Sequence, residues 1–273
     1  MTDVFEVSGR GQLRAGVDFR PITPDLSRAV YIAGYGPNRP ATGIHDDLWV
    51  RTLALAVGET SPVLAACDLV GLFRPEVQAI EVELRKRDAA PDALIVACTH
   101  NHQGPDTLGL WGPDRQTSGV DPQYMIWLRA QIADSVEAAL GALRPACLKA
   151  AVVKAPPGVV KNIRDPGILD DDLACLRVET PEGQPLATLA NFAAHPEAMG
   201  PHNTLITSDF PHFLRERVES ADGGICLFLS ADLGGMMTPD VAENSWEEIE
   251  RVGRSLADCA LEALAEASLL EVD

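Results

Sequence analysis

The chain has 273 residues, of which 46% are hydrophobic and 23% are charged, and its formal net charge at pH 7 is −18. This composition supplies enough apolar side chains for a core and suits one large or two small domains. The acidic excess argues against a nucleic-acid partner, which needs a basic surface. No run of about eighteen apolar residues occurs, so we expect no transmembrane segment.

Cysteine usage and the start of the chain bear on the compartment. The six cysteines are scattered and form no C-x-x-C pair. This pattern favours small core residues in a reducing compartment over a disulfide framework or a cysteine zinc site. Residues 1–16 are polar and lack the apolar stretch of a secretory leader. We therefore expect a cytoplasmic protein, or a secreted one if a leader precedes the printed sequence.

Apolar runs bounded by turn residues predict strands, and segments with apolar residues three and four positions apart predict helices. Strands and helices alternate, but several strands follow one another directly. We therefore predict a single layered α/β domain over residues 1–273, with a mixed, largely parallel sheet flanked by helices. The predicted strands are 13–19, 48–57, 62–66, 94–98, 148–155, 174–179, 186–193 and 225–229, and the predicted helices are 75–87, 123–143, 213–218 and the segment after Ser245.

Two histidines follow the apolar run Leu94–Cys98, in the sequence Thr99-His100-Asn101-His102. If the chain is still extended there, His100 and His102 point to the same side, because side chains alternate along a strand. Ligands of open α/β sheets bind beyond the carboxyl ends of strands, so the pair is a candidate metal site. A polar loop with two solvated histidines is the alternative interpretation.

Two other residues occupy a similar position at the end of an apolar run. His195 follows the predicted strand 186–193 and precedes a proline. A lone histidine of this kind is more often structural, but together with His100 and His102 it becomes a third candidate arm of a metal site. Asp68 follows the strand 62–66, where it could be a metal ligand or could cap the next turn, the commoner role of such an aspartate.

Three residues are weaker candidates for substrate contacts. Tyr35 lies between two glycines and could line a pocket, although partly buried tyrosines more often only pack. His45 precedes a predicted strand and by default is a solvated turn histidine. Arg164 lies in a polar loop, where it could hold a substrate oxygen or remain solvated.

The last clear strand opens into a glycine-rich turn that ends in Thr238-Pro239. The pair Gly234-Gly235 would let backbone N–H groups approach a ligand closely. Thr238 would then be a nucleophile or a hydrogen-bond donor. An ordinary strand-to-helix turn is the alternative.

Several short motifs occur along the chain in a definite order: Ala15-Gly16-Val17, Ile22-Thr23-Pro24, Gly34-Tyr35-Gly36, Gly43-Ile44-His45-Asp46, Thr99-His100-Asn101-His102-Gln103-Gly104-Pro105, Asn191-Phe192-Ala193-Ala194-His195-Pro196, Ser208-Asp209-Phe210-Pro211 and Thr238-Pro239. In this order they resemble the N-terminal domain of the neutral/alkaline (non-lysosomal) ceramidases, which are zinc amidases. The similarity extends over nearly the whole chain. Its most specific parts are the motifs that contain His100 and His195.

The resemblance implies that His100 and His195 bind zinc and that His102 lies beside the metal. Thr238 stands where the ceramidases have a catalytic serine, although Met236 replaces the aspartate of their turn. The ceramidases complete their zinc site with a glutamate and a tyrosine from much later in the chain, and this sequence has no tyrosine after Tyr124. Three explanations stay open: a fragment, a relative that has lost the chemistry, or a site completed by local carboxylates such as Asp68 or Asp232.

The main hypothesis is a zinc-dependent hydrolase that cleaves an amide or ester bond of a small molecule through metal-activated water or a hydroxyl group. His102 or an aspartate would move the proton, and Thr238 with the backbone of Gly234 and Gly235 would hold the oxyanion. The alternative is an inactive, metal-free scaffold or binding domain with the same fold. Iron or manganese would also suit histidine ligands, so zinc follows from the resemblance. A homo-oligomer is compatible with either hypothesis.

Overall fold

The computed structural model of the chain describes residues 11–270. The expectation that residues 1–16 contain no secretory leader concerns mainly residues 1–10, which lie outside this range. Within it, no helix combines the length and the apolar character needed to cross a membrane.

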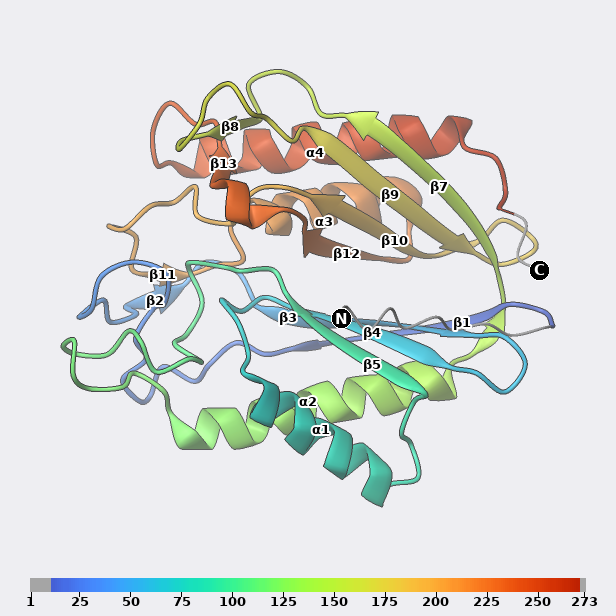
Figure 1. Cartoon of the computed structure of the whole chain (residues 1–273), viewed down its shortest axis with the longest axis horizontal. Helices are drawn as coiled ribbons and strands as arrows, with labels where there is room; N and C mark the ends of the chain where they lie inside the picture. The colour runs from blue at the N-terminus through green and yellow to red at the C-terminus, as the bar shows by residue number, and fades with distance from the viewer. Residues whose placement is uncertain (1–10, 271–273) are drawn as a thin grey trace.

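Two β-sheets lie face to face between two pairs of helices, so the fold has four layers (Figure 1). One sheet has the strand order β5-β4-β3-β1-β6 and the other has the order β12-β10-β9-β7. The first contains β1 (Arg14–Pro21), β3 (Trp49–Ala56), β4 (Pro62–Cys67), β5 (Ala93–Cys98) and β6 (Arg144–Pro145), and the second contains β7 (Cys147–Lys154), β9 (Asp172–Glu179), β10 (Pro185–Phe192) and β12 (Ile225–Ser230).

The helices cover the outer faces of the sheets. The first sheet carries α1 (Arg74–Lys86) and α2 (Pro122–Gly141), and the second carries α3 (Phe210–Asp222) and α4 (Trp246–Glu266). Two small strand pairs lie at the margins: β2 (Gly43–Ile44) with β11 (Leu205–Ile206), and β8 (Val160–Asn162) with β13 (Met237–Pro239). A short 3-10 helix, η1 (Leu233–Gly235), precedes β13.

The layered α/β class, every predicted strand and every predicted helix are confirmed, but the expectation of a largely parallel sheet is wrong. In the two main sheets, only β4–β5 and β10–β12 pair in parallel. The other pairs, β1–β3, β1–β6, β3–β4, β7–β9 and β9–β10, are antiparallel. The reason is the connections: β3–β4 and β9–β10 are joined by short turns, whereas each parallel pair has a helix between its strands.

Three hydrophobic clusters fill the spaces between the four layers. One lies between the first sheet and its helices and contains Leu128 and Ile132. Another lies between the second sheet and its helices and contains Phe192 and Phe228. The third joins the inner faces of the two sheets and contains Leu53, Ala66, Val178, Ala187 and Leu227, among others. Each fully buried Leu or Phe contributes roughly 1.5–3 kcal/mol to folding.

The ends of the two parallel pairs meet at one edge of the molecule. The Ser230 hydroxyl, at the end of β12, donates to the carbonyl of Thr99, just after β5 (2.6 Å). The backbone N–H of His102, in the loop after β5, donates to the carbonyl of Pro196, in the loop after β10 (2.9 Å). The loops that carry the candidate histidines are therefore joined directly, although they come from different sheets.

Candidate metal centre

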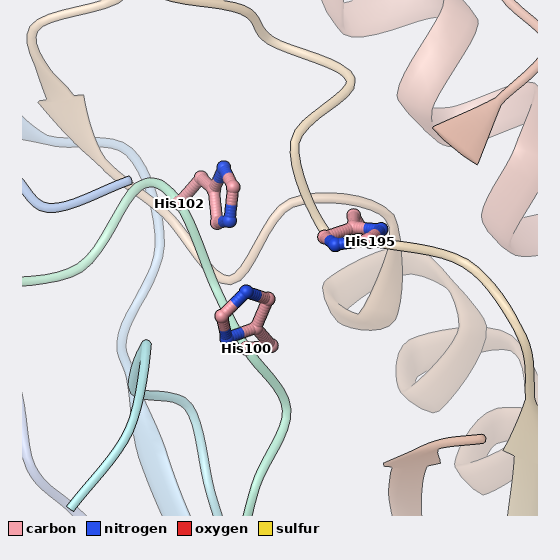
Figure 2. A group of neighbouring side chains, drawn as sticks. All are labelled: His100, His102 and His195. Carbon is pink, nitrogen blue, oxygen red and sulfur yellow. The ribbon is translucent and has the colours of Figure 1, made fainter. Parts of the chain in front are cut away.

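Three histidines converge at this edge. One ring nitrogen each from His100, His102 and His195 lies within 4.8 Å of the other two. The ring centroids are 4.9 Å (His100–His102), 5.2 Å (His100–His195) and 5.6 Å (His102–His195) apart. Figure 2 shows the three rings turned so that one nitrogen of each faces a common point. Three imidazoles around one point form a donor set typical of zinc centres.

Backbone carbonyls fix the orientation of two of these rings. Nδ1 of His100 lies 2.7 Å from the carbonyl oxygen of Val70, and Nδ1 of His195 lies 2.6 Å from that of Met237. A carbonyl oxygen can only accept a hydrogen bond, so Nδ1 carries the hydrogen in both rings. Their lone pairs are then on Nε2, the arrangement found in most metal-binding histidines.

The third ring has a carboxylate and a tyrosine as neighbours. Nδ1 of His102 lies 3.1 Å from Oε2 of Glu197, an ion-pair distance without the alignment of a full hydrogen bond. The ring of Tyr35 meets that of His102 edge-on, with centroids 5.3 Å apart and an interplanar angle of 88°. The Tyr35 hydroxyl donates to the backbone carbonyl of Glu197 at 2.8 Å. Tyr35 and Glu197 thus enclose His102 on the side away from the other histidines.

The surroundings lower the pKa of His100 and that of the neighbouring carboxylate, Glu197. Burial lowers the pKa of His100, and the nearby His102 and His195 lower it further. Burial acts to raise the pKa of Glu197, but the neighbouring His102 and Thr238 bring it below its usual value. Burial and the charge of Glu197 raise the pKa of Tyr35, so its hydroxyl remains a donor. Three imidazole nitrogens that converge on one point suit a bound cation, so the donor set fits zinc.

The convergence of His100 and His102 depends on a turn, which corrects the expectation of an extended chain. Strand β5 ends at Cys98, and His100 has a φ of +61°, in the left-handed region. Such a conformation costs a non-glycine residue about 1–3 kcal/mol, and the surrounding structure must hold it. Buried Asn101 does so, since its side chain donates to the carbonyl of Thr207 (2.9 Å) and accepts from the N–H of Gln103 (2.9 Å).

The loop before β2 forms a wall against His102. A Cβ on Gly34 would lie 2.4 Å from Cγ of His102, and Gly34 has a φ of +101°. Only glycine fits this close approach. The buried guanidinium of Arg39 donates to the carbonyls of Ala33 and His102, both at 3.0 Å. Arg39 thereby ties this loop to the backbone of His102.

The structure does not bring Asp68 to the histidines. Its Oδ1 forms a buried ion pair with Arg215 of α3 at 2.8 Å, and its Oδ2 accepts from the backbone N–H of Trp49 at 2.9 Å. Asp68 is 1% exposed, and Arg215 is 3% exposed. Both carboxylate oxygens are therefore occupied in linking the first sheet to a helix of the other half. Asp232, the other local carboxylate, is exposed at the start of η1.

His45 and Arg164 also lie apart from the cluster. The ring of His45 stacks on that of Trp246, with centroids 3.8 Å apart and an interplanar angle of 7°, and its Nδ1 lies 2.8 Å from Oδ2 of Asp46. Arg164 is exposed in the loop after β8. Between residues 11 and 270, no hydrogen bond or ion pair connects either side chain to the three histidines.

The glycine-rich turn adjoins the cluster through the residues that follow the glycines. Its left-handed residue is Met236 (φ +64°), and Gly234 and Gly235 adopt no positive φ. A Cβ on either glycine would meet its nearest neighbour at 3.7 or 3.6 Å, an ordinary contact. Met237 supplies the carbonyl that fixes His195, and the adjacent Thr238 helps to lower the pKa of Glu197. The turn therefore supports the site from β13.

Glu197 and the supporting roles of Gly34, Arg39 and Asn101 are not predicted from the sequence. Glu197 had a local signal, since a carboxylate two residues after a candidate ligand can orient a neighbouring histidine. The other three act through backbone contacts between distant segments. Nothing in the local sequence indicates such contacts.

The chain is similar to known proteins in its three-dimensional structure. No family model and no curated protein matches the chain. The crystal structure of neutral ceramidase from Pseudomonas aeruginosa superposes with a TM-score of 0.80 and 18% identity, over 93% of this chain and 45% of that one. A ceramidase complexed with C2 gives 0.81 and 19%, over 93% and 44%. The chain spans less than half the length of these structures, and its fold is that of a neutral ceramidase-like domain.

Proposed function

We propose that this chain is the metal-binding domain of a zinc-dependent hydrolase that cleaves the amide bond, or an ester bond, of a small molecule. The observation that carries the proposal is the cluster of His100, His102 and His195, with the Nδ1 atoms of two rings facing backbone carbonyls. The ceramidase-like fold supports an amide as the substrate bond. Zinc is the metal that best suits three imidazole ligands together with the fold.

Nε2 of His100 and Nε2 of His195 would hold the metal, and a ring nitrogen of His102 faces the same point. When bound, zinc would supply a Lewis acid for the substrate carbonyl and favour the ionisation of water. His102 then has two roles open to it: it can complete the ligand set, or it can accept a proton at Nε2 during attack on the carbonyl. Thr238, with the backbone of Gly234 and Gly235, is proposed to contact the developing oxyanion.

The first experiment is elemental analysis of protein purified without chelators. We expect stoichiometric zinc in the wild type and none in the His100→Ala/His195→Ala double variant. The exposed His202 provides a control of the same residue type, and His202→Ala should keep its zinc. His102→Ala separates the two roles of His102, since loss of zinc identifies a ligand, whereas loss of turnover with zinc retained identifies a proton carrier.

Hydrolysis is then measured on N-acyl amides and matched esters. Turnover that disappears in the double variant and persists in the His202→Ala control is the expected result. A wild-type chain that takes up no zinc, even when zinc is supplied, would refute the proposal. That outcome would favour the alternative of a scaffold or binding domain, which is motivated by the chain spanning less than half of the ceramidase structures.

A further inference from the structure

We infer that Glu197 is a positioning residue that sets the tautomer of His102, so that this ring presents the lone pair of Nε2 to the cluster. The inference rests on the proposed metal site and concerns the ring of His102. It assigns a role to a side chain that comes from the loop of His195 and acts on the loop of His102.

The three rings share one pattern of contacts at Nδ1. For His100 and His195 the neighbour of Nδ1 is a backbone carbonyl oxygen, at 2.7 and 2.6 Å. For His102 the neighbour is Oε2 of Glu197, at 3.1 Å. Each of these oxygens can accept a hydrogen and cannot donate one, so all three rings are directed towards the same tautomer, with hydrogen on Nδ1 and the lone pair on Nε2.

The position of Glu197 is decisive because His102 has no substitute acceptor. Its Nδ1 is buried, and no atom of residues 11–270 forms a well-aligned hydrogen bond with it. The carboxylate of Glu197 is thus the one acceptor at ion-pair distance. Without it, the hydrogen of His102 is free to move to Nε2. An N–H aimed at the common point would replace a lone pair there and oppose a bound cation.

Glu197 is itself held on two sides. The Tyr35 hydroxyl donates to its backbone carbonyl at 2.8 Å and lies 3.4 Å from its Oε2. The backbone N–H of Gly200 donates to the same carbonyl at 2.9 Å. The ring of Tyr35 also contacts the edge of His102, so one tyrosine packs against both members of the pair.

The geometry favours positioning over direct coordination by Glu197. Its carboxylate is not part of the group whose ligand atoms approach within 4.8 Å of one another. It meets His102 at Nδ1, whereas the lone pair needed for a metal is on Nε2. A carboxylate, a histidine and a metal in that order form a known arrangement in which the carboxylate orients the ring and strengthens its basicity.

The test is a direct measurement of tautomers by long-range ¹H–¹⁵N correlation on metal-free protein labelled with ¹⁵N-histidine, at one fixed pH above the usual histidine range. In the wild type we expect His100, His102 and His195 all to carry hydrogen on Nδ1. In Glu197→Ala, His102 alone should move towards the Nε2–H form. His100 and His195 are internal controls because backbone carbonyls hold them, and Glu182→Ala, at an exposed turn, is the matched control variant.

Metal affinity, measured by competition with a chromophoric chelator, gives a second readout. If His102→Ala identifies His102 as a ligand, Glu197→Ala should weaken zinc binding by about 10–100-fold, the usual effect of losing a residue that orients a ligand. Tyr35→Phe, which keeps the carboxylate but loses the hydroxyl that holds it, should give a smaller loss and a partial tautomer shift. Glu182→Ala should leave both readouts unchanged.

Two results would overturn the inference: hydrogen on Nε2 of His102 in the wild type, or a His102 signal that does not change in Glu197→Ala. Loss of the His100 and His195 signals would reveal that Glu197→Ala does not fold. In that case the tautomer of His102 in the wild type and in the Tyr35→Phe variant still tests the inference. The tautomers are measured without metal. A wild-type protein that binds no zinc therefore refutes the proposed function and leaves this measurement intact.

Discussion

Replacing Gly34 by alanine should disturb the candidate metal centre from a residue that binds no metal. A Cβ added to Gly34 would lie 2.4 Å from Cγ, 2.5 Å from Cβ and 2.8 Å from Cα of His102. The backbone of Gly34 has a φ of +101°, which side chains rarely allow. The substitution therefore adds both conformational strain and a steric overlap, and the atoms that it strikes belong to His102.

The size of the effect follows from these two terms. Holding alanine at such a backbone angle costs about 1–3 kcal/mol. Relieving the overlap requires a shift of about 1 Å, from 2.4 Å to an ordinary contact of 3.4 Å, and overpacking of this kind costs about 1–3 kcal/mol. We expect Gly34→Ala to lower the free energy of unfolding by about 2–6 kcal/mol. A shift of 1 Å in His102 exceeds the tolerance of about 0.5 Å for a preorganised site, so zinc affinity should fall at least about tenfold.

The assay is urea unfolding of metal-free protein, followed by zinc titration of whatever folded variant is obtained. Gly36→Ala is the matched control, because it lies in the same loop, has no positive φ and would place its Cβ with nothing within 4 Å. The control should stay within about 0.5 kcal/mol of the wild type. A Gly34→Ala protein with wild-type stability and wild-type zinc affinity would refute the proposed contact between this loop and His102.

Three further predictions concern residues around the site. Asp68→Asn should destabilise the fold by about 3–5 kcal/mol, because it leaves the buried charge of Arg215 without its partner. Calorimetry measures this loss. A variant that keeps wild-type stability but binds less zinc would contradict the structural role assigned to Asp68. Burial raises the pKa of Asp209 from 3.8 to about 6, so the folded state binds a proton at this carboxylate more tightly than the unfolded state does. Its contribution to stability is therefore greatest below about pH 4 and is lost as the pH rises from about 4 to just above 6. Relative to Asp209→Asn, the wild type should lose about 2 kcal/mol between pH 4 and 7 in urea unfolding, and parallel pH curves would exclude this. Gly234→Ala and Gly235→Ala should each change stability by less than about 1 kcal/mol, since their new Cβ atoms make ordinary contacts; thermal melts test this, and a large loss would show that the turn requires glycine.

Much of the fold was predictable because its signals are local. Each strand of the two main sheets that the sequence predicts is a short apolar run between turn residues, and such a run has the same appearance in any tertiary context. The helix α4 begins where Ser245 precedes Glu248, and in the structure the Ser245 hydroxyl accepts from the backbone N–H of Glu248. Strand direction was not predictable from the same signals. It depends on whether a turn or a helix joins two strands and on which sheet each strand enters.

The candidate site also contains residues that the sequence predicts and residues whose role only the tertiary structure reveals. His100, His102 and His195 were recognisable from the sequence because each follows an apolar run, the place where ligands of α/β sheets commonly bind. The role of Asp68 was not recognisable, since a carboxylate after a strand pairs with whatever cation tertiary packing brings to it. That cation is Arg215, which is 147 residues away along the chain.

The sequence by itself determined where the chain is apolar, where it turns and which side chains can bind a metal. Only the tertiary structure decided that the two histidine loops meet, that His100 adopts a left-handed turn, and that Glu197 stands beside Nδ1 of His102. The physical reason is that hydrophobic periodicity and turn preference act between neighbours in sequence. Hydrogen bonds and ion pairs act over about 3 Å in space, so their partners are known only once the layers are packed.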